Sequence, residues 1–150
     1  MSAAQNHVSL LHRSSEKAGS LEYCKENGIS CFSDMVLEQG ALTGRYDAAH
    51  PFPEGSGRGA AYNARLKELD ALVSELKKIG GCHGISPAQT ATAWAIAKGT
   101  LPIIGVTKVK QVEEAAAAAN VELDAEETAR LEALGGEAGV STLREWEKEM

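Results

Sequence analysis

The sequence predicts an α/β fold in which helices cover a sheet of parallel strands. Short apolar runs at 7–11, 29–33 and 101–106 are each followed by a loop and a helical pattern, which is the order of a parallel sheet with crossover helices. Aromatic residues make up only 5% of the chain, so the core rests on Leu, Val, Ile and Ala, which suit close packing of helices on a sheet. Right-handed crossovers restrict this order to a doubly wound sheet or part of a (β/α) barrel.

The first helix is expected over 16–26, between the strands at 7–11 and 29–33. Ser14 and Ser15 can cap its start, because serine hydroxyls accept from free backbone N–H groups. Asn27-Gly28 supplies a left-handed stop. The apolar run that follows at once is typical of a buried parallel strand.

A long loop is expected over 44–62, where prolines and glycines interrupt every regular pattern. Long loops inside a domain are often functional. Apolar residues at spacings of three and four then predict an amphipathic helix over 65–79, ended by Gly80-Gly81.

Three further helices are expected toward the C-terminus. Ser86-Pro-Ala-Gln89 is a capping box with proline at the first helical position, and it opens a helix through Ala97. A helix over 110–119 follows the third strand. A second capping box at 124–127 opens a helix that stops at Gly135-Gly136, before a tail over 137–150 whose last ten residues form a short helix or coil.

Composition and charge exclude several classes of function. The 150 residues are 43% hydrophobic and 24% charged, as in one globular domain. The net charge of -6 disfavours nucleic acid or an anionic membrane as the main partner. Because no apolar run approaches the roughly 20 residues of a membrane span, a cytoplasmic protein is expected. Three widely spaced cysteines predict reduced thiols, and the four histidines share no metal spacing, so no metal site is expected.

Three strands are too few to complete either architecture. A parallel sheet requires both faces and both edges to be covered, whereas three strands leave two edges open. The chain is therefore expected to be a piece of something larger.

Five segments carry a resemblance to a known family when they are taken in order. They are QNHVSLLHR at 5–13, YCKENGI at 23–29, MVLEQGALTGRY at 35–46, SPAQTATAW at 86–94 and PIIGVTK at 102–108. Together they resemble the C-terminal half of an aldo-keto reductase. The resemblance implies the sixth to eighth strands of a (β/α)8 TIM barrel, and NADPH-dependent reduction of small-molecule aldehydes and ketones.

The resemblance also implies that no catalytic residue is present. In the family, the catalytic aspartate, tyrosine, lysine and histidine lie on the first four strands, before the matching region starts. Tyr23, Tyr46 and Tyr62 have no motif that pairs them with a lysine for proton donation. Glu38 lacks a carboxylate partner and is expected to be solvated. The chain alone is therefore expected to be a truncated, inactive member.

The cofactor-binding side of the family is represented, by resemblance, in ten residues. Gln5 matches the glutamine that holds the nicotinamide carboxamide, whereas Asp34 stands where the family places a stacking tyrosine. That carboxylate removes the stacking face and adds negative charge, so weakened NADP(H) binding is expected. The other matches are Leu37, Gln39, Gly40 and Arg45 in the pyrophosphate loop, and Gly105, Thr107, Lys108, Gln111 and Glu114 around the adenosine phosphate.

Two alternatives remain open at this stage. One is a non-catalytic half-barrel module, completed by a separate N-terminal half or by a second copy that covers the open strand edges. The other is a decayed product that does not fold, suggested by Asp34 and by Val8, which stands where the family commonly has an aromatic residue.

Overall fold

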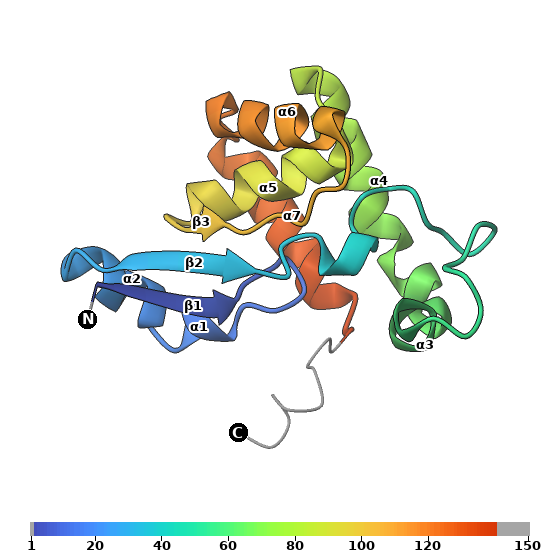
Figure 1. Ribbon diagram of the computed structural model, residues 1–150, viewed down its shortest axis with the longest axis horizontal. Helices are drawn as coiled ribbons and strands as arrows, with labels where there is room; N and C mark the ends of the chain where they lie inside the picture. Colours follow the sequence, from blue (N-terminus) through green and yellow to red (C-terminus); the bar gives the residue numbers. More distant parts are fainter. Residues whose placement is uncertain (1, 141–150) are drawn as a thin grey trace.

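The computed structural model describes residues 2–140 and contains one parallel sheet with the order β1-β2-β3 (Figure 1). The alternation expected from the sequence is thereby confirmed. The elements are β1 (Ala3–His7), α1 (Ser14–Lys17), α2 (Ser20–Glu26), β2 (Ser30–Asp34), the 3-10 turn η1 (Glu38–Gly40), α3 (Gly57–Tyr62), η2 (Asn63–Arg65), α4 (Leu66–His83), α5 (Pro87–Ala97), β3 (Leu101–Pro102), α6 (Val109–Ala117), η3 (Ala118–Asn120) and α7 (Ala125–Glu137).

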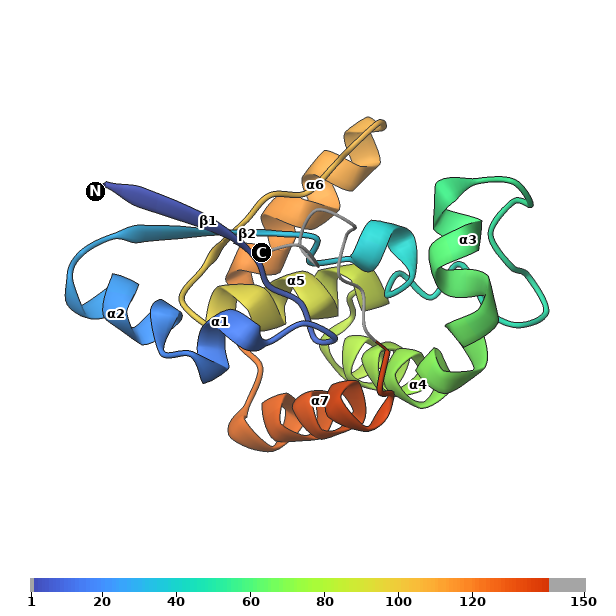
Figure 2. The ribbon, with the colours of Figure 1, turned by 90° about the horizontal axis from the view of Figure 1, so that it is seen from below.

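Among the described residues, most of the helices lie on one face of the sheet. Figure 2 shows α1, α2, α4, α5 and α7 on the same side of β1 and β2. Ala3 pairs with Ser30 and His7 with Asp34, so β1 and β2 are in register along their whole length. Cys31 and Ser33 are buried toward the helices, and their alternating neighbours occupy the other face.

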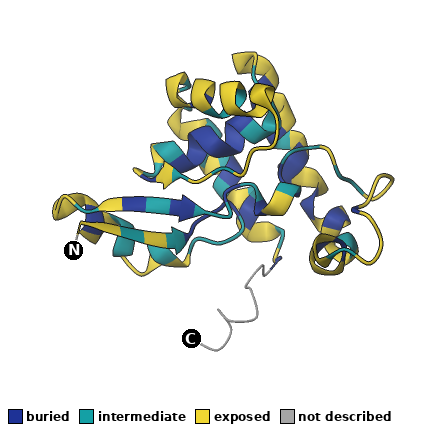
Figure 3. Cartoon of the chain, in the orientation of Figure 1, coloured by how far each residue is buried: buried dark blue, intermediate teal, exposed yellow. Residues whose placement is uncertain are grey.

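The main core lies between the layer of α4, α5 and α7 and the segments that follow β1 and β2 (Figure 3). In α4, apolar residues recur every three or four positions, which places them on one face toward α5 and α7. Trp94 of α5 is 0% exposed. A second cluster joins the loop after β2 to α3 and α4 through Phe52, Tyr62 and Leu69.

Two capping boxes open helices as the sequence predicts. Ser86 Oγ accepts from the Gln89 N–H at 3.2 Å while the Gln89 side chain accepts from the Ser86 N–H at 3.0 Å. Asp124 and Glu127 do the same at the start of α7. Each box satisfies two backbone donors that a helix start leaves free.

The first strand lies four residues earlier than the predicted run at 7–11. β1 ends at His7, and Ser9 and His12 exchange backbone hydrogen bonds of 3.1 Å in a tight turn. Val8 and Leu10 are buried in the main core. The apolar run at 7–11 is therefore mainly a buried turn rather than a strand. A short apolar run indicates burial but does not distinguish a strand from a turn.

The predicted helix over 16–26 is two short helices. Gly19 adopts a φ of +76° between α1 and α2, and Ser14 lies inside α1 without capping it. The expected left-handed stop is confirmed at Gly28, with a φ of +63°. A glycine that can reach the left-handed region breaks a helix as readily as it ends one.

The third strand is shorter than the predicted run at 101–106. β3 contains only Leu101 and Pro102. The Ile103 N–H still donates to the Ser33 carbonyl oxygen at 2.8 Å. The chain then leaves the sheet toward α6.

Two glycine pairs that were expected to end helices lie inside them. α4 runs through Gly80-Gly81 to His83, and a side chain at Gly80 would meet the Ile85 carbonyl oxygen at 2.7 Å. α7 runs through Gly135-Gly136, and Gly135 lies against the Leu10 carbonyl oxygen. The first glycine of each pair serves close packing rather than termination.

The segment over 44–62 is not entirely a loop. Its last six residues form α3, where Ser56 Oγ caps the start by accepting from the Gly59 N–H at 2.9 Å. In the tail over 137–150, Val140 is buried, and the predicted short helix or coil over 141–150 lies outside the described residues. Within 2–140, no helix is both long and apolar enough to cross a membrane.

Candidate functional site

A cavity of about 870 Å³ opens where the loops that follow β2 and β3 approach α6. The loop over 35–46 forms one wall and the segment over 103–107 forms another. Gln111, Glu114 and Ala115 of α6 contribute further lining, together with Arg58 of α3 and the first turn of α5. The cavity therefore lies at the carboxyl ends of parallel strands, where ligands bind in α/β folds.

The cavity brings together eight of the ten residues singled out by the sequence. These are Leu37, Gln39, Gly40, Arg45, Gly105, Thr107, Gln111 and Glu114. They come from three segments separated by up to about 70 positions of chain, so only the fold could make them neighbours. Gln5 and Lys108 are not among the lining residues.

Cationic side chains line one part of the cavity. Arg45 and Arg58 are both exposed, with guanidinium carbons 5.6 Å from the Tyr46 ring centroid and 5.9 Å from the Phe52 ring centroid, respectively. A guanidinium over an aromatic face is held by cation–π attraction without losing its hydrogen-bond donors. Two such groups can bind an anionic ligand.

The Gln111 side chain caps the start of α6. Its Oε1 accepts from the Thr107 N–H at 2.8 Å and from the Lys108 N–H at 3.0 Å. These are backbone donors that a helix start would otherwise present to an anion. Lys110 forms an ion pair with Glu114 at 3.6 Å on the same helix, so the charges at this end partly offset one another.

Gln5 and Asp34 contact each other on neighbouring strands. Gln5 Nε2 donates to Asp34 Oδ2 at 3.1 Å, although the two residues are not paired in the strand register. The amide that the sequence assigns to a carboxamide ligand is thus engaged by a carboxylate of the chain itself.

Glu38 was expected to be solvated, and this prediction is wrong. The residue is fully buried. Its Oε2 accepts from the Tyr62 hydroxyl at 2.8 Å, and its Oε1 accepts from His7 Nε2 at 2.9 Å and from the Ser9 hydroxyl. Burial raises the pKa of the Tyr62 hydroxyl, and the negative charge of Glu38 raises it further, so Tyr62 stays protonated as the donor.

No local signal in the sequence identifies this cluster. His7 and Glu38 are 31 positions apart, and Glu38 and Tyr62 are 24 apart. A single glutamate between apolar residues and a glycine is usually a surface residue. The one available hint was Tyr62 at the end of the predicted loop over 44–62, and nothing in the sequence indicated that its partner is Glu38.

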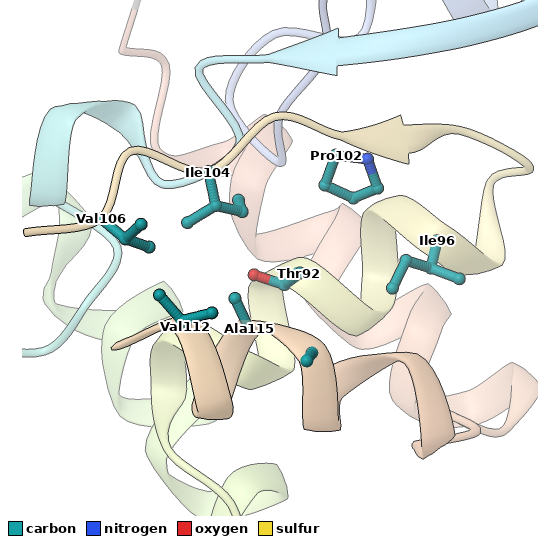
Figure 4. Close-up of a pocket in the computed structure, with 8 residues that line it drawn as sticks. Thr92, Ile96, Pro102, Ile104, Val106, Val112 and Ala115 are labelled. Carbon is teal, nitrogen blue, oxygen red and sulfur yellow. The ribbon is translucent and has the colours of Figure 1, made fainter. Parts of the chain in front are cut away.

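A smaller apolar pocket of about 350 Å³ adjoins the cavity between β3, α5 and α6. Figure 4 shows Ile104 and Val106 facing Val112 and Ala115 across it. Ile104, Ala115 and Thr92 line both the pocket and the cavity. An apolar recess next to a polar, cationic cavity suits a ligand with an apolar group at one end.

The remaining chemistry-bearing residues form no second site in 2–140. No group of three or more His, Cys, Asp and Glu that could hold a metal ion occurs there. Cys24 and Cys31 are buried and Cys82 is exposed, all without a disulfide. Burial raises the pKa of the Cys31 thiol, as does the nearby Cys24, which makes it less reactive.

Comparison with known proteins agrees with this arrangement. A model of the Aldo/keto reductase family matches residues 1–135. Pyridoxal reductase, chloroplastic, of Arabidopsis thaliana is 32% identical over 142 residues, which cover 95% of this chain and 38% of that protein. An aldo-keto reductase of Strobilurus tenacellus is 32% identical over 129 residues, covering 83% of this chain and 38% of that protein.

Solved structures share the fold. The glycerol dehydrogenase of Gluconobacter oxydans superposes with a TM-score of 0.78 at 20% identity, covering 95% of this chain and 45% of that one. An aldo-keto reductase solved in complex with NADPH gives a TM-score of 0.63, also at 20% identity, covering 95% and 37%. The chain spans less than half the length of these relatives. It belongs to the aldo-keto reductase family of oxidoreductases and forms part of an α/β barrel.

Proposed function

We propose that this chain is the cofactor-binding side of an aldo-keto reductase, its C-terminal half, and binds NADP(H) in the 870 Å³ cavity. One observation carries the proposal: eight residues chosen from the sequence for cofactor contact line a single cavity, although they come from separate segments. The complete protein would reduce small aldehydes and ketones, with the cofactor supplying hydride. A relative of the same fold binds NADPH.

The cavity residues suit the phosphate part of a dinucleotide. Arg45 and Arg58 offer cationic donors in a fork that matches phosphate oxygens. Gly40 has a φ of +107°, which glycine adopts without strain, and the rings of Tyr46 and Phe52 lie where its side chain would be. Gly105 faces open space. These residues would bind and orient the cofactor.

The nicotinamide end fits less well. Asp34 accepts from Gln5 at 3.1 Å, so the Gln5 amide must exchange one partner for another when it binds a carboxamide. Asp34 also offers no ring to stack on nicotinamide. We therefore expect NADP(H) to bind more weakly than in relatives with an aromatic residue at this position.

Within 2–140, we expect no proton donor for carbonyl reduction. Tyr62 is buried, donates to Glu38 and has a raised pKa, so it is neither accessible nor acidic enough to act. We expect no turnover by these 150 residues alone. NADPH oxidation followed at 340 nm with reactive aldehydes tests this, and turnover that Gln5→Ala abolishes would contradict it.

Cofactor binding is tested by calorimetric titration of the chain with NADPH. Arg45→Ala should weaken binding about tenfold through loss of a charge-assisted contact. The matched control is Lys78→Ala, which removes an equal charge from α4, outside the cavity. Asp34→Tyr should strengthen binding. Equal affinities for all three variants and the wild type, or no binding at millimolar NADPH, would refute the proposal.

A second candidate is a half-barrel assembly module, and exposed apolar residues favour it. Around β3 and α6, the large apolar side chains of Leu101, Ile103, Val109 and Val112 are exposed. The sheet order β1-β2-β3 also leaves the outer edges of β1 and β3 unpaired within 2–140. Light scattering after size exclusion should then show association that Ile103→Lys reduces. A monomer at every concentration would contradict this function.

A further inference from the structure

The loop that forms one wall of the cavity has an unusual backbone. Met35, Glu38 and Gln39 have φ values of +59°, +47° and +54°, in the left-handed region that side chains disfavour. Non-glycine residues persist in that region only where the surroundings hold them there. Something in the structure must therefore stabilise this loop.

The Glu38 side chain is the anchor. It is fully buried and accepts from His7, Ser9 and Tyr62, which belong to β1, the turn after β1, and α3. Ser9 Oγ also accepts from the Leu11 and His12 N–H groups at 3.1 and 3.0 Å. One carboxylate thus joins the loop to two separate parts of the chain, segment 7–9 and α3.

Residues on both sides of Glu38 line the cavity, whereas Glu38 does not. Leu37, Gln39 and Gly40 are lining residues. The helix that carries Tyr62 also carries Arg58 into the cavity lining. Two cavity walls, the loop and α3, therefore meet at the hydrogen bond between Tyr62 and Glu38.

We propose that Glu38 is the positioning residue of the cavity: its buried carboxylate, held by His7, Ser9 and Tyr62, keeps the 35–40 loop in the left-handed conformation that shapes the binding wall. The identity of the ligand, a dinucleotide, rests on the proposed function. The conformation of the loop does not. Glu38 acts through the loop backbone and touches no ligand.

The test uses two variants that keep the shape of the side chain. Tyr62→Phe removes one donor, and Glu38→Gln replaces the charged acceptor by an amide. The control is Thr100→Val, which removes a buried hydroxyl bonded to Ser33 and to the Ala95 carbonyl oxygen, neither of which belongs to the 35–40 loop. Amide hydrogen exchange without ligand, the NADPH dissociation constant and Tm are measured for each.

We expect exchange over 35–40 to rise about tenfold in Tyr62→Phe and more in Glu38→Gln, and NADPH affinity to fall in the same order. Thr100→Val should lower Tm to a similar extent with neither effect. Unchanged loop exchange in both variants overturns the proposal, as does faster exchange with unchanged NADPH affinity. If the wild type binds no NADPH while loop exchange still rises, the proposed function fails and the positioning role of Glu38 is supported.

Discussion

The layer of α4, α5 and α7 buries its apolar side chains and is the closed layer of the molecule. The side formed by β3 and α6 exposes apolar side chains to solvent and is the open side. Leu76, Trp94 and Leu131 in the closed layer are all 0% exposed. On the open side, Val109 is 75% exposed and Val112 is 51% exposed, and no residue of α6 is buried. The buried core and the candidate binding surface are therefore located in separate parts of this chain.

Charged residues follow the same division. Arg13, Glu16, Lys98 and Glu132 form a closed network of alternating charges that joins α1, α5 and α7, with N···O distances of 2.5 to 2.7 Å. On α6, by contrast, Lys110 and Glu114 form an exposed ion pair within one helix. Networks contribute more to stability than isolated surface pairs do.

The largest effect is expected when a buried side chain in the closed layer is shortened. Leu76→Ala should lower the free energy of unfolding by about 2–5 kcal/mol, because it deletes fully buried methyl groups. Val112→Ala on the open side should change it by no more than about 0.5 kcal/mol. Urea denaturation followed by circular dichroism measures both. Similar losses at the two positions would erase the distinction between the two sides.

Adjacent glycines in α7 should respond with opposite signs. Gly135→Ala forces a methyl group against the Leu10 carbonyl oxygen and should cost about 1–3 kcal/mol. Gly136→Ala meets nothing within 4 Å and should gain about 0.4–1 kcal/mol, since alanine restricts the unfolded chain. Thermal unfolding of the two variants measures both changes. A stabilising Gly135→Ala would show that α7 is not tightly packed.

The charge network should make the closed layer sensitive to acid. Partial burial opposes ionisation of Glu16, but hydrogen bonds from Arg13 and Lys98 outweigh it and lower the pKa of the carboxyl group. Because folding lowers the pKa of Glu16 from its ordinary value of about 4.5, the ionised carboxylate stabilises the folded state above that pH. This stability is lost as the pH falls through the pKa of the folded state.

Lys98→Met removes one cation of this network while keeping the side-chain stem. It should cost about 1 kcal/mol at neutral pH, and the loss of stability below about pH 4.5 should become shallower than in the wild type. Denaturation midpoints across an acid series measure this. A variant with the wild-type pH slope would show that Glu16 does not depend on Lys98.

The smallest effect is expected on α6. Lys110→Ala breaks an exposed pair of 3.6 Å with Glu114 and should change the free energy of unfolding by no more than about 0.3 kcal/mol. The same melts with 1 M salt provide the control, since screening should remove what little the pair contributes. A larger loss would mean that α6 depends on this pair to stay folded.

Local signals in the sequence predicted much of the fold. The capping boxes at Ser86 and Asp124 involve residues three positions apart, and the apolar face of α4 recurs within one or two turns. Such interactions are complete within a short stretch of chain. The errors at Gly80 and Gly135 have the opposite origin, because each glycine is required by a residue outside its own helix turn.

The candidate site divides in the same way. Through their resemblance to the family, the segments at 35–46 and 102–108 pointed to residues that do line the cavity. Gln5 and Lys108 lie elsewhere. Their placement depended on where β1 begins and how α6 is capped, and neither is visible in a single motif.

The sequence by itself determined the alternating α/β order and the capped helix starts, because these depend on neighbouring residues. Only the tertiary structure decided that Val8 and Leu10 belong to a buried turn, that glycine pairs lie inside helices, and that Glu38 is buried against His7, Ser9 and Tyr62. Each depends on contacts between residues far apart in the chain, and the free energy of such contacts exists only once the chain has folded.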